Sequence, residues 1–357
     1  MIPYILLIAV PPIVSYVLFS ASSKRDKMPK AASFIFFAIF ILLLSLRDTS
    51  VGVDTDAYKG FFNRVGNIDW VNLEDLYGME YGFLVFMKIV NGVFGDFRAF
   101  IVIVALISVC PLLYFYVKEN KSVILTISLF LVAAPFTMYF SGLRQIIAMA
   151  FAIPLYYLAR KKKLIWFILL VILATQFHAS AVALIALYPL LNIKITEKGL
   201  FFSLPLIGLV FVFNKPIFEF LLGFMDEKYE KYIDNEASGA FMMIILFILF
   251  VVFSFIITDE KALSIDDIRM RNLLVICMII QFFAPVNDIA MRINYYYMPF
   301  VPVAVSRMVA VAKPKYKQVA KLATVVMSTF FIIYYIIKAQ TGEDILEIYP
   351  YKFFWES

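Results

Sequence analysis

The chain has 357 residues, of which 63% are hydrophobic and 16% charged, and its formal net charge is +6. Ordinary soluble domains are about 45–50% apolar and about 25% charged, so this composition excludes a water-soluble fold. The positive charge does not indicate nucleic acid as a partner, because the basic residues form short clusters beside apolar segments, as the positive-inside bias of membrane proteins requires. We therefore expect an integral membrane protein that binds no nucleic acid.

Apolar segments close to the ~20 residues needed to cross ~30 Å of hydrocarbon recur along the chain. Backbone groups in lipid must pair within their own segment, so these segments are predicted to be helices. The predicted spans are 2–20, 31–46, 97–117, 122–140, 143–160, 163–177, 178–192, 199–214, 240–258, 271–286, 293–311 and 318–338. The expected fold is an all-α, polytopic transmembrane helical bundle of about 12 spans, forming a single domain over 1–357.

A further apolar piece, 82–95, is only about 14 residues long, which is short for a full span. If it crossed completely, the basic cluster from Lys24 to Lys30 would lie opposite all later basic clusters, against the charge rule. We therefore interpret it as a re-entrant or interfacial segment. The resulting topology places both termini outside the cytoplasm, with extracytoplasmic loops at about 47–81 and 215–239.

Four arginines are predicted at the outer boundary of the membrane, where charge is costly and needs a reason. Arg98, Arg144 and Arg292 stand at the outer starts of helices, and Arg47 closes the span 31–46. Helix N-termini favour anions, and a guanidinium group matches phosphate oxygens two at a time. The four are candidates for a diphosphate clamp. For each one, snorkelling to the interface or pairing with a carboxylate is the alternative.

Acidic side chains and the single histidine lie in the same predicted region. In RDTSVGVDTDAY (47–58), Asp54 and Asp56 would face one side of an extended backbone. Two carboxylates without a histidine nearby are weak support for a metal site, and a solvated turn is the alternative. Glu80, beside the short apolar piece, is expected to have a raised pKa. His178 is either a structural hydrogen-bonding residue or a general base or substrate ligand.

These segments follow one another in a defined order. RDTSVGVDTDAY precedes EYGF at 80–83, SGLRQIIAMAFA at 141–152, FHASA at 177–181 and MRINYYY at 291–297. Together with IYPYKFFW at 348–355, the ordered set resembles the EpsG-like branch of the Wzy-type polymerases of bacterial O-antigen, capsule and exopolysaccharide. The resemblance covers roughly 31–311 and the C-terminal end.

The resemblance implies a membrane glycosyltransferase of the bacterial inner membrane. Such an enzyme joins undecaprenyl-diphosphate-linked oligosaccharide repeat units on the extracytoplasmic face, beside a chain-length regulator and with no cofactor or metal. By motif, it carries over Arg47, Asp54, Asp56, Glu80, Arg144, Gln145, His178 and Arg292. The rival functions are a transporter or flippase of the same lipid-linked material and another membrane transferase, such as a ligase or acyltransferase.

The expected reaction has two needs. The departing diphosphate requires charge stabilisation, which arginines supply, with Gln145 as a further substrate-binding residue. The acceptor hydroxyl requires a base, which is His178 or one of the carboxylates of Asp54, Asp56 and Glu80.

Overall fold

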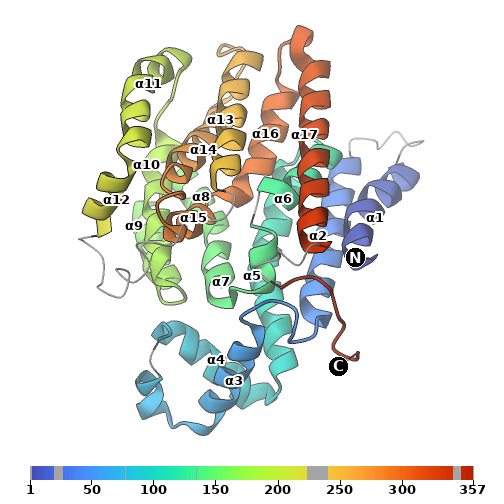
Figure 1. The fold of residues 1–357 in the computed structure, drawn as a ribbon, viewed down its shortest axis with the longest axis vertical. Coiled ribbons are helices and arrows are strands. Elements are labelled where there is room, and N and C mark those ends of the chain that lie inside the picture. The colour runs from blue at the N-terminus through green and yellow to red at the C-terminus, as the bar shows by residue number, and fades with distance from the viewer. Residues whose placement is uncertain are drawn as a thin grey trace.

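A computed structural model describes residues 2–19, 27–76, 78–133, 135–222, 240–340 and 347–356, and helices dominate it (Figure 1). The predicted all-α class is confirmed. The first half of the chain forms α1 (Ile2–Phe19), α2 (Met28–Leu46), α3 (Thr55–Asn67), η2 (Trp70–Asp75), α4 (Tyr81–Phe94), α5 (Phe97–Glu119), α6 (Val123–Ala133), η3 (Thr137–Phe140), α7 (Leu143–Ala150), α8 (Ala152–Arg160) and α9 (Leu164–Thr175). The second half forms η4 (Ala179–Ala186), α10 (Leu187–Asn192), α11 (Glu197–Val212), α12 (Asn214–Leu222), α13 (Ala240–Ile257), α14 (Ile265–Gln281), α15 (Asp288–Asn294), η6 (Met298–Phe300), α16 (Val301–Ala310) and α17 (Pro314–Gln340).

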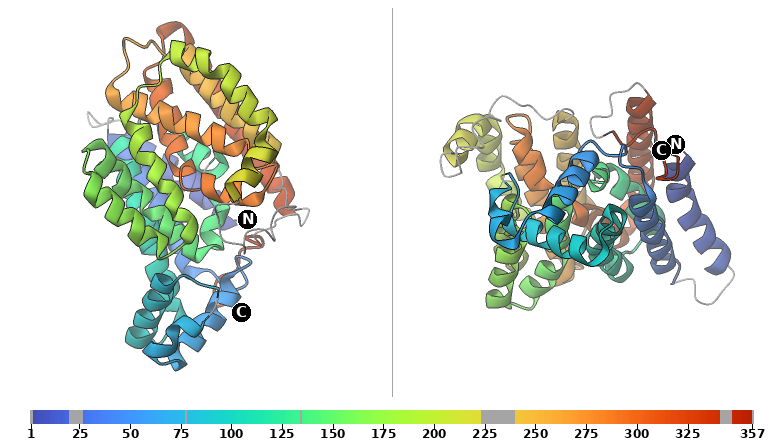
Figure 2. Two further views of the ribbon diagram at one scale, coloured as in Figure 1. Left: turned by 90° about the vertical axis from the view of Figure 1, so that its left-hand side faces the viewer. Right: turned by 90° about the horizontal axis from the view of Figure 1, so that it is seen from below.

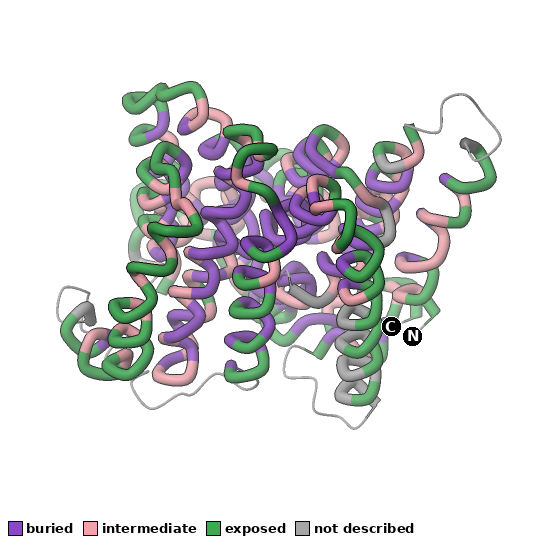
Figure 3. Tube along the Cα trace, turned by 90° about the horizontal axis from the view of Figure 1, so that it is seen from above, coloured by how far each residue is buried: buried purple, intermediate pink, exposed green. Residues whose placement is uncertain are grey.

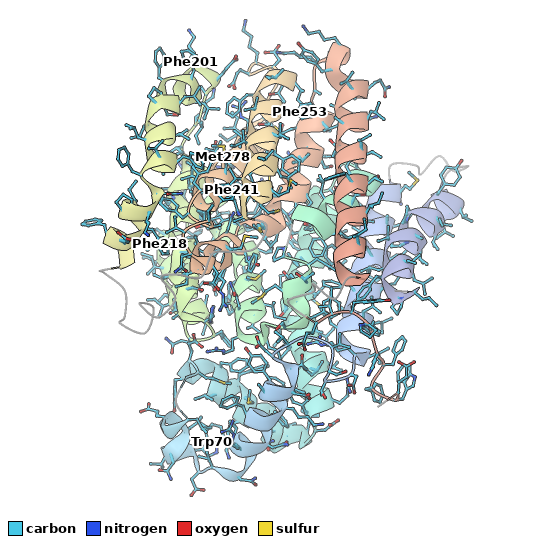
Figure 4. The ribbon with its side chains drawn as sticks, viewed as in Figure 1. Trp70, Phe201, Phe218, Phe241, Phe253 and Met278 are labelled. Carbon is cyan, nitrogen blue, oxygen red and sulfur yellow. The ribbon has the colours of Figure 1, made fainter. Side chains whose placement is uncertain are left out.

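The molecule consists of a helical bundle and a smaller layer, made of α3, η2 and α4, beneath one end of it (Figures 1 and 2). We call this end of the bundle the lower end and the opposite one the upper end. Trp70 lies at the tip of the small layer and Phe201 at the upper end (Figure 4). Buried residues concentrate where the bundle helices meet, and exposed residues follow the periphery (Figure 3). The predicted outer loop 47–81 is therefore mostly helical.

Helices α2 and α5 pack antiparallel and fix the position of the short apolar piece. Arg98 at the start of α5 donates to the carbonyl of Ser45 near the end of α2, at 3.1 Å. At the other end of the pair, Asn120 donates to Ser33 at 2.9 Å. The chain thus leaves α2 and enters α5 at the lower end, and α4 lies between them in the small layer. The segment forms a single helix and not a re-entrant hairpin. Its position at the membrane interface stays a prediction.

Proline residues divide several of the predicted spans. A proline lacks a backbone N–H and its ring clashes with the carbonyl four residues earlier. Pro154 removes the hydrogen bond to the carbonyl of Ala150, and the segment 143–160 forms α7 and α8 with a break at Phe151. Pro299 and Pro302 likewise lie where 293–311 separates into the end of α15, η6 and α16. Pro135 follows α6, which covers only the first part of 122–140.

Among the described residues, α5 and α13 are long and apolar enough to cross a bilayer by themselves. The pair α11 and α12, bent by 75°, would make a third span if counted as one. Six further apolar helices are shorter, at 10–17 residues. A bundle of about twelve crossings is therefore not confirmed. The predicted loop 215–239 begins within α12, and its remainder, 223–239, lies outside the described residues.

The C-terminal segment 347–356 returns to the lower end of the bundle. Tyr4 of α1 donates to the carbonyl of Ile348, and Tyr351 donates to the carbonyl of Leu43 at 2.8 Å. The backbone of Phe353 forms an antiparallel bridge with Arg47. The start of α1 and this segment therefore lie together beside the end of α2.

Candidate functional site

A carboxylate at the lower end of the bundle binds groups from two distant segments. Glu80 Oε2 accepts a hydrogen bond from Arg144 Nη1 at 2.7 Å. Its Oε1 accepts from the backbone N–H of Ala179 at 3.0 Å and lies 3.2 Å from His178 Nδ1. The Nδ1 contact has ion-pair distance but not the alignment of a hydrogen bond. All three side chains keep about a fifth to a quarter of their surface exposed, so the cluster is sheltered but open.

The environment of Glu80 keeps its carboxylate ionised. Burial by itself would raise its pKa, but His178, the charge of Arg144 and the Ala179 N–H together lower the pKa to about 2. The expected raised pKa is therefore wrong, because these three neighbouring groups together outweigh desolvation. A carboxylate with such a low pKa is a weak base near neutral pH. Glu80 is better suited to orient its neighbours.

Local backbone geometry brings the partners of Glu80 together. Glu80 is the extended residue that precedes α4, and the next turn of that helix lies against the segment before His178. The N–H of Phe83 donates to the carbonyl of Gln176 at 3.0 Å. A Cβ on Gly82 would lie 2.5 Å from the Cβ of Gln176, so only glycine allows this approach. The EYGF run thus joins α4 to the junction of α9 and η4.

Arg144 stands in the first turn of α7 and has further partners. Its Nη1 also donates to the carbonyl of Gly78 at 3.0 Å, and its Nε donates to the hydroxyl of Tyr58 at 3.4 Å. Burial raises the pKa of Tyr58, so its hydroxyl stays neutral. Tyr58 was not among the predicted site residues, although it closes the RDTSVGVDTDAY run.

Gln145 and Arg292 are linked, but through the backbone of the arginine. Gln145 Nε2 donates to the carbonyl of Arg292 at 2.7 Å. The side chain of Arg292 is half-exposed, and its Nη2 lies 3.2 Å from Asp288 Oδ2. Within the described part of the chain, no contact joins the guanidinium of Arg292 to Glu80 or Arg144. The motifs SGLRQ and MRIN are therefore packed together through Gln145 and the Arg292 backbone, while the guanidinium of Arg292 stays half-exposed and accessible to a ligand.

Arg47 and Arg98 lie at the end of α2. Arg98 Nη1 donates to the carbonyls of Ser45 and Arg47. Arg47 is buried and donates from Nη1 to the carbonyl of Leu44 at 2.9 Å, and its Nε and Nη2 have no hydrogen-bond partner. Where the chain is described, no contact joins either residue to Glu80, Arg144 or His178. The structure therefore does not join the four predicted arginines in one cluster, because two of them bind carbonyls at the end of a helix.

Asp54 and Asp56 do not share a face. Asp54 precedes α3 and Asp56 lies in its first turn, both exposed. Residues two apart on a helix point in different directions. The expectation of an extended backbone is therefore wrong, and so is the shared orientation that it gave. The Asp54 carboxylate accepts from the hydroxyl of Ser141 at 3.1 Å, whereas Asp56 makes no described contact.

The sequence reasoning missed a second ionic cluster, at the upper end. Glu119 at the end of α5 pairs with Arg160 at 3.3 Å and with Arg307 at 2.9 Å. Arg307 also pairs with Asp267 at 2.8 Å, and Arg160 with Asp266. The i, i+3 spacing of Arg269 and Asp266 was the only local sign of it, because the other partners are far apart in sequence.

The apolar helices indicate a membrane protein, and the cluster of Glu80, Arg144 and His178 at the lower end is its candidate functional site. The family model of EpsG matches residues 30–353, and the chain belongs to the EpsG family. The predicted resemblance to that family is thus confirmed. Membership makes this a membrane protein of polysaccharide biosynthesis. No curated protein and no solved structure matches the chain.

Proposed function

We propose that this EpsG-family protein polymerises undecaprenyl-diphosphate-linked oligosaccharide repeat units at its lower end, on the extracytoplasmic face of the bacterial inner membrane. The observation that carries the proposal is the ionised Glu80 carboxylate between Arg144 and His178. It combines a cation, suited to a phosphate, with a titratable imidazole in one sheltered place.

The proposed base is His178. Glu80 faces its Nδ1, which leaves Nε2 as the nitrogen that receives a proton. The acceptor sugar hydroxyl attacks the anomeric carbon of the donor, and its proton passes to Nε2. The bond between that carbon and the diphosphate oxygen breaks, and undecaprenyl diphosphate leaves with the electron pair. Glu80 stabilises the imidazolium that forms.

The proposed diphosphate ligands are Arg144 and Arg292. The described hydrogen bonds of Arg144 use its Nε and Nη1 atoms, so Nη2 is the nitrogen that we propose for the diphosphate. The side chain of Arg292 is half-exposed and held only by Asp288 within the described chain. Guanidinium N–H groups stabilise the negative charge that develops on a leaving diphosphate. In this proposal Arg47 and Arg98 hold the end of α2, and they do not bind substrate.

The extracytoplasmic orientation rests on the positive-inside bias. Lys30 lies in the first turn of α2 and Lys118 in the last turn of α5, and the antiparallel packing of the two helices puts both at the upper end. If basic residues mark the cytoplasmic side, the lower end and both chain ends face outward. Labelling of single cysteines at positions 30 and 118 tests this arrangement. Opposite accessibility of the two positions would contradict it.

Product analysis tests the activity. Deletion of the gene is expected to leave surface glycan of single repeat units, and the wild-type gene to restore a ladder. Arg144→Ala, Arg292→Ala and His178→Ala should each restore little polymer, whereas Arg64→Ala, at an exposed arginine of α3, should restore the ladder. Loss of every exported unit on deletion would indicate a flippase. A normal ladder from all three site variants would remove the proposed mechanism.

A further inference from the structure

We propose that Asp54 and Ser141 are positioning residues that set the direction of Arg144, so that Asp54 does not act as the base. The inference rests on the proposed function. It concerns two segments, 52–58 and 140–144, that are 80 or more residues apart in the chain. Contacts along the whole of the first segment join it to the second.

The segment that carries Arg144 needs external support. Phe140 ends η3, and Ser141 and Gly142 have non-helical backbone angles before α7 begins. Arg144 therefore stands only two residues after a turn. The direction of its side chain depends on whatever holds that turn in place.

Four contacts from the other segment hold the turn. The buried hydroxyl of Thr55 lies 3.3 Å from the carbonyl oxygen of Phe140 and 3.1 Å from that of Val51, and it shares its one proton between them. Gly52 approaches the same carbonyl so closely that a Cβ would lie 1.9 Å from its oxygen. Ser141 Oγ accepts from the N–H of Asp54 at 3.3 Å and donates to its carboxylate at 3.1 Å.

A fifth contact reaches Arg144 itself. The hydroxyl of Tyr58, one turn after Asp54 on α3, accepts from Arg144 Nε at 3.4 Å. Asp54, which precedes α3, acts on this turn through Ser141, and Tyr58, within α3, contacts Arg144 directly. No described contact joins Asp54 to Glu80 or His178. The Asp54 carboxylate is engaged with a hydroxyl that supports the turn, and this explains its place in the motif without a role in proton transfer.

The test measures chain extension in membrane vesicles that contain the full-length protein. The probe is the undecaprenyl-diphosphate-linked repeat unit extracted from the gene-deleted host. Asp54→Ala removes the bond from the Ser141 hydroxyl to the carboxylate, and Ser141→Ala removes that bond together with the one from the Asp54 backbone N–H. Each variant should raise KM about tenfold, and the double variant should match Ser141→Ala, because the two side chains share one contact and their effects do not add. The conservative Asp54→Asn should stay within about threefold of wild type, since its amide oxygen still accepts from Ser141. The pH profile of kcat should not move in any of them.

Two results would overturn the inference while the wild-type protein is active. The first result is a loss of kcat that is as severe in Asp54→Asn as in Asp54→Ala, with the kcat of Ser141→Ala equal to that of the wild type. A role of Asp54 as the base would give this result. The other is a double variant whose defect is the product of the single ones. Lys59→Ala, at an exposed residue of α3, is the matched control and should behave as wild type. An inactive wild-type protein with this probe would overturn the proposed function, and the inference with it.

Discussion

Arg144 Nη1 lies 2.7 Å from Glu80 Oε2, although the two residues are 64 positions apart in the chain. The pair joins the first turn of α7 to the residue before α4, and so ties the bundle to the small layer beneath it. His178 approaches the other oxygen of the same carboxylate. One acidic side chain therefore organises the cation and the imidazole that the proposed reaction requires.

The stability that Glu80 supplies should depend on pH. Its pKa falls from 4.5 to about 2 in the folded protein, so its contribution is complete above pH 4.5 and is lost as pH falls toward 2. We expect the difference in Tm between wild type and Glu80→Gln, in detergent, to be constant from about pH 6 to about pH 8 and to shrink below about pH 4.5. A difference that grows on acidification would contradict the assignment.

Replacement of His178 should affect turnover more than folding. Loss of a general base typically lowers kcat by about 10²- to 10⁴-fold, and we expect this for His178→Ala. The Nδ1 atom lacks an aligned hydrogen bond, so Tm should change little. Initial rates with extracted lipid-linked repeat units measure the first effect. A kcat close to that of the wild type in the variant would show that another group accepts the proton.

Two glycines near the site should respond to alanine with opposite sign. Gly52 has φ +98° and lies against the carbonyl of Phe140, so Gly52→Ala should destabilise the protein by at least about 2 kcal/mol. Gly60, within α3, has open space around it, and Gly60→Ala should stabilise by about 0.5–1 kcal/mol. Thermal unfolding of both variants in one detergent measures the contrast. Equal shifts would mean that the segment 52–58 is not packed as described.

The upper ionic cluster should be a major source of stability. Glu119 is buried between Arg160 and Arg307, and its removal leaves each arginine with one remaining carboxylate, Asp266 and Asp267 respectively. Breaking a buried pair costs up to about 3–5 kcal/mol, so Glu119→Gln should lower Tm. Glu197→Gln, at an exposed position of α11, is the control and should have little effect. An unchanged Tm in Glu119→Gln would contradict this, because it would mean that Asp266 and Asp267 alone compensate the two arginines.

Composition and motif order were enough to predict a membrane protein, its all-α class and its resemblance to the EpsG family. Long apolar segments indicate a membrane protein, and the bilayer then requires helices, because backbone groups in lipid must pair within their own segment. The predicted count of about twelve spans is not confirmed. Hydropathy does not register that prolines such as Pro154 remove a helical hydrogen bond and divide a continuous apolar run.

The tertiary structure decided which candidate residues meet. The sequence predicted a cation at Arg144, an acid at Glu80 and an imidazole at His178, but not that one carboxylate would face both of the others and have its pKa lowered. Nor could it show that Arg47 and Arg98 bind carbonyls at the end of α2, or that Asp54 faces Ser141. Local sequence determines which side chains are present and which helices form. Contacts between residues 64 to 99 positions apart depend on how those helices pack.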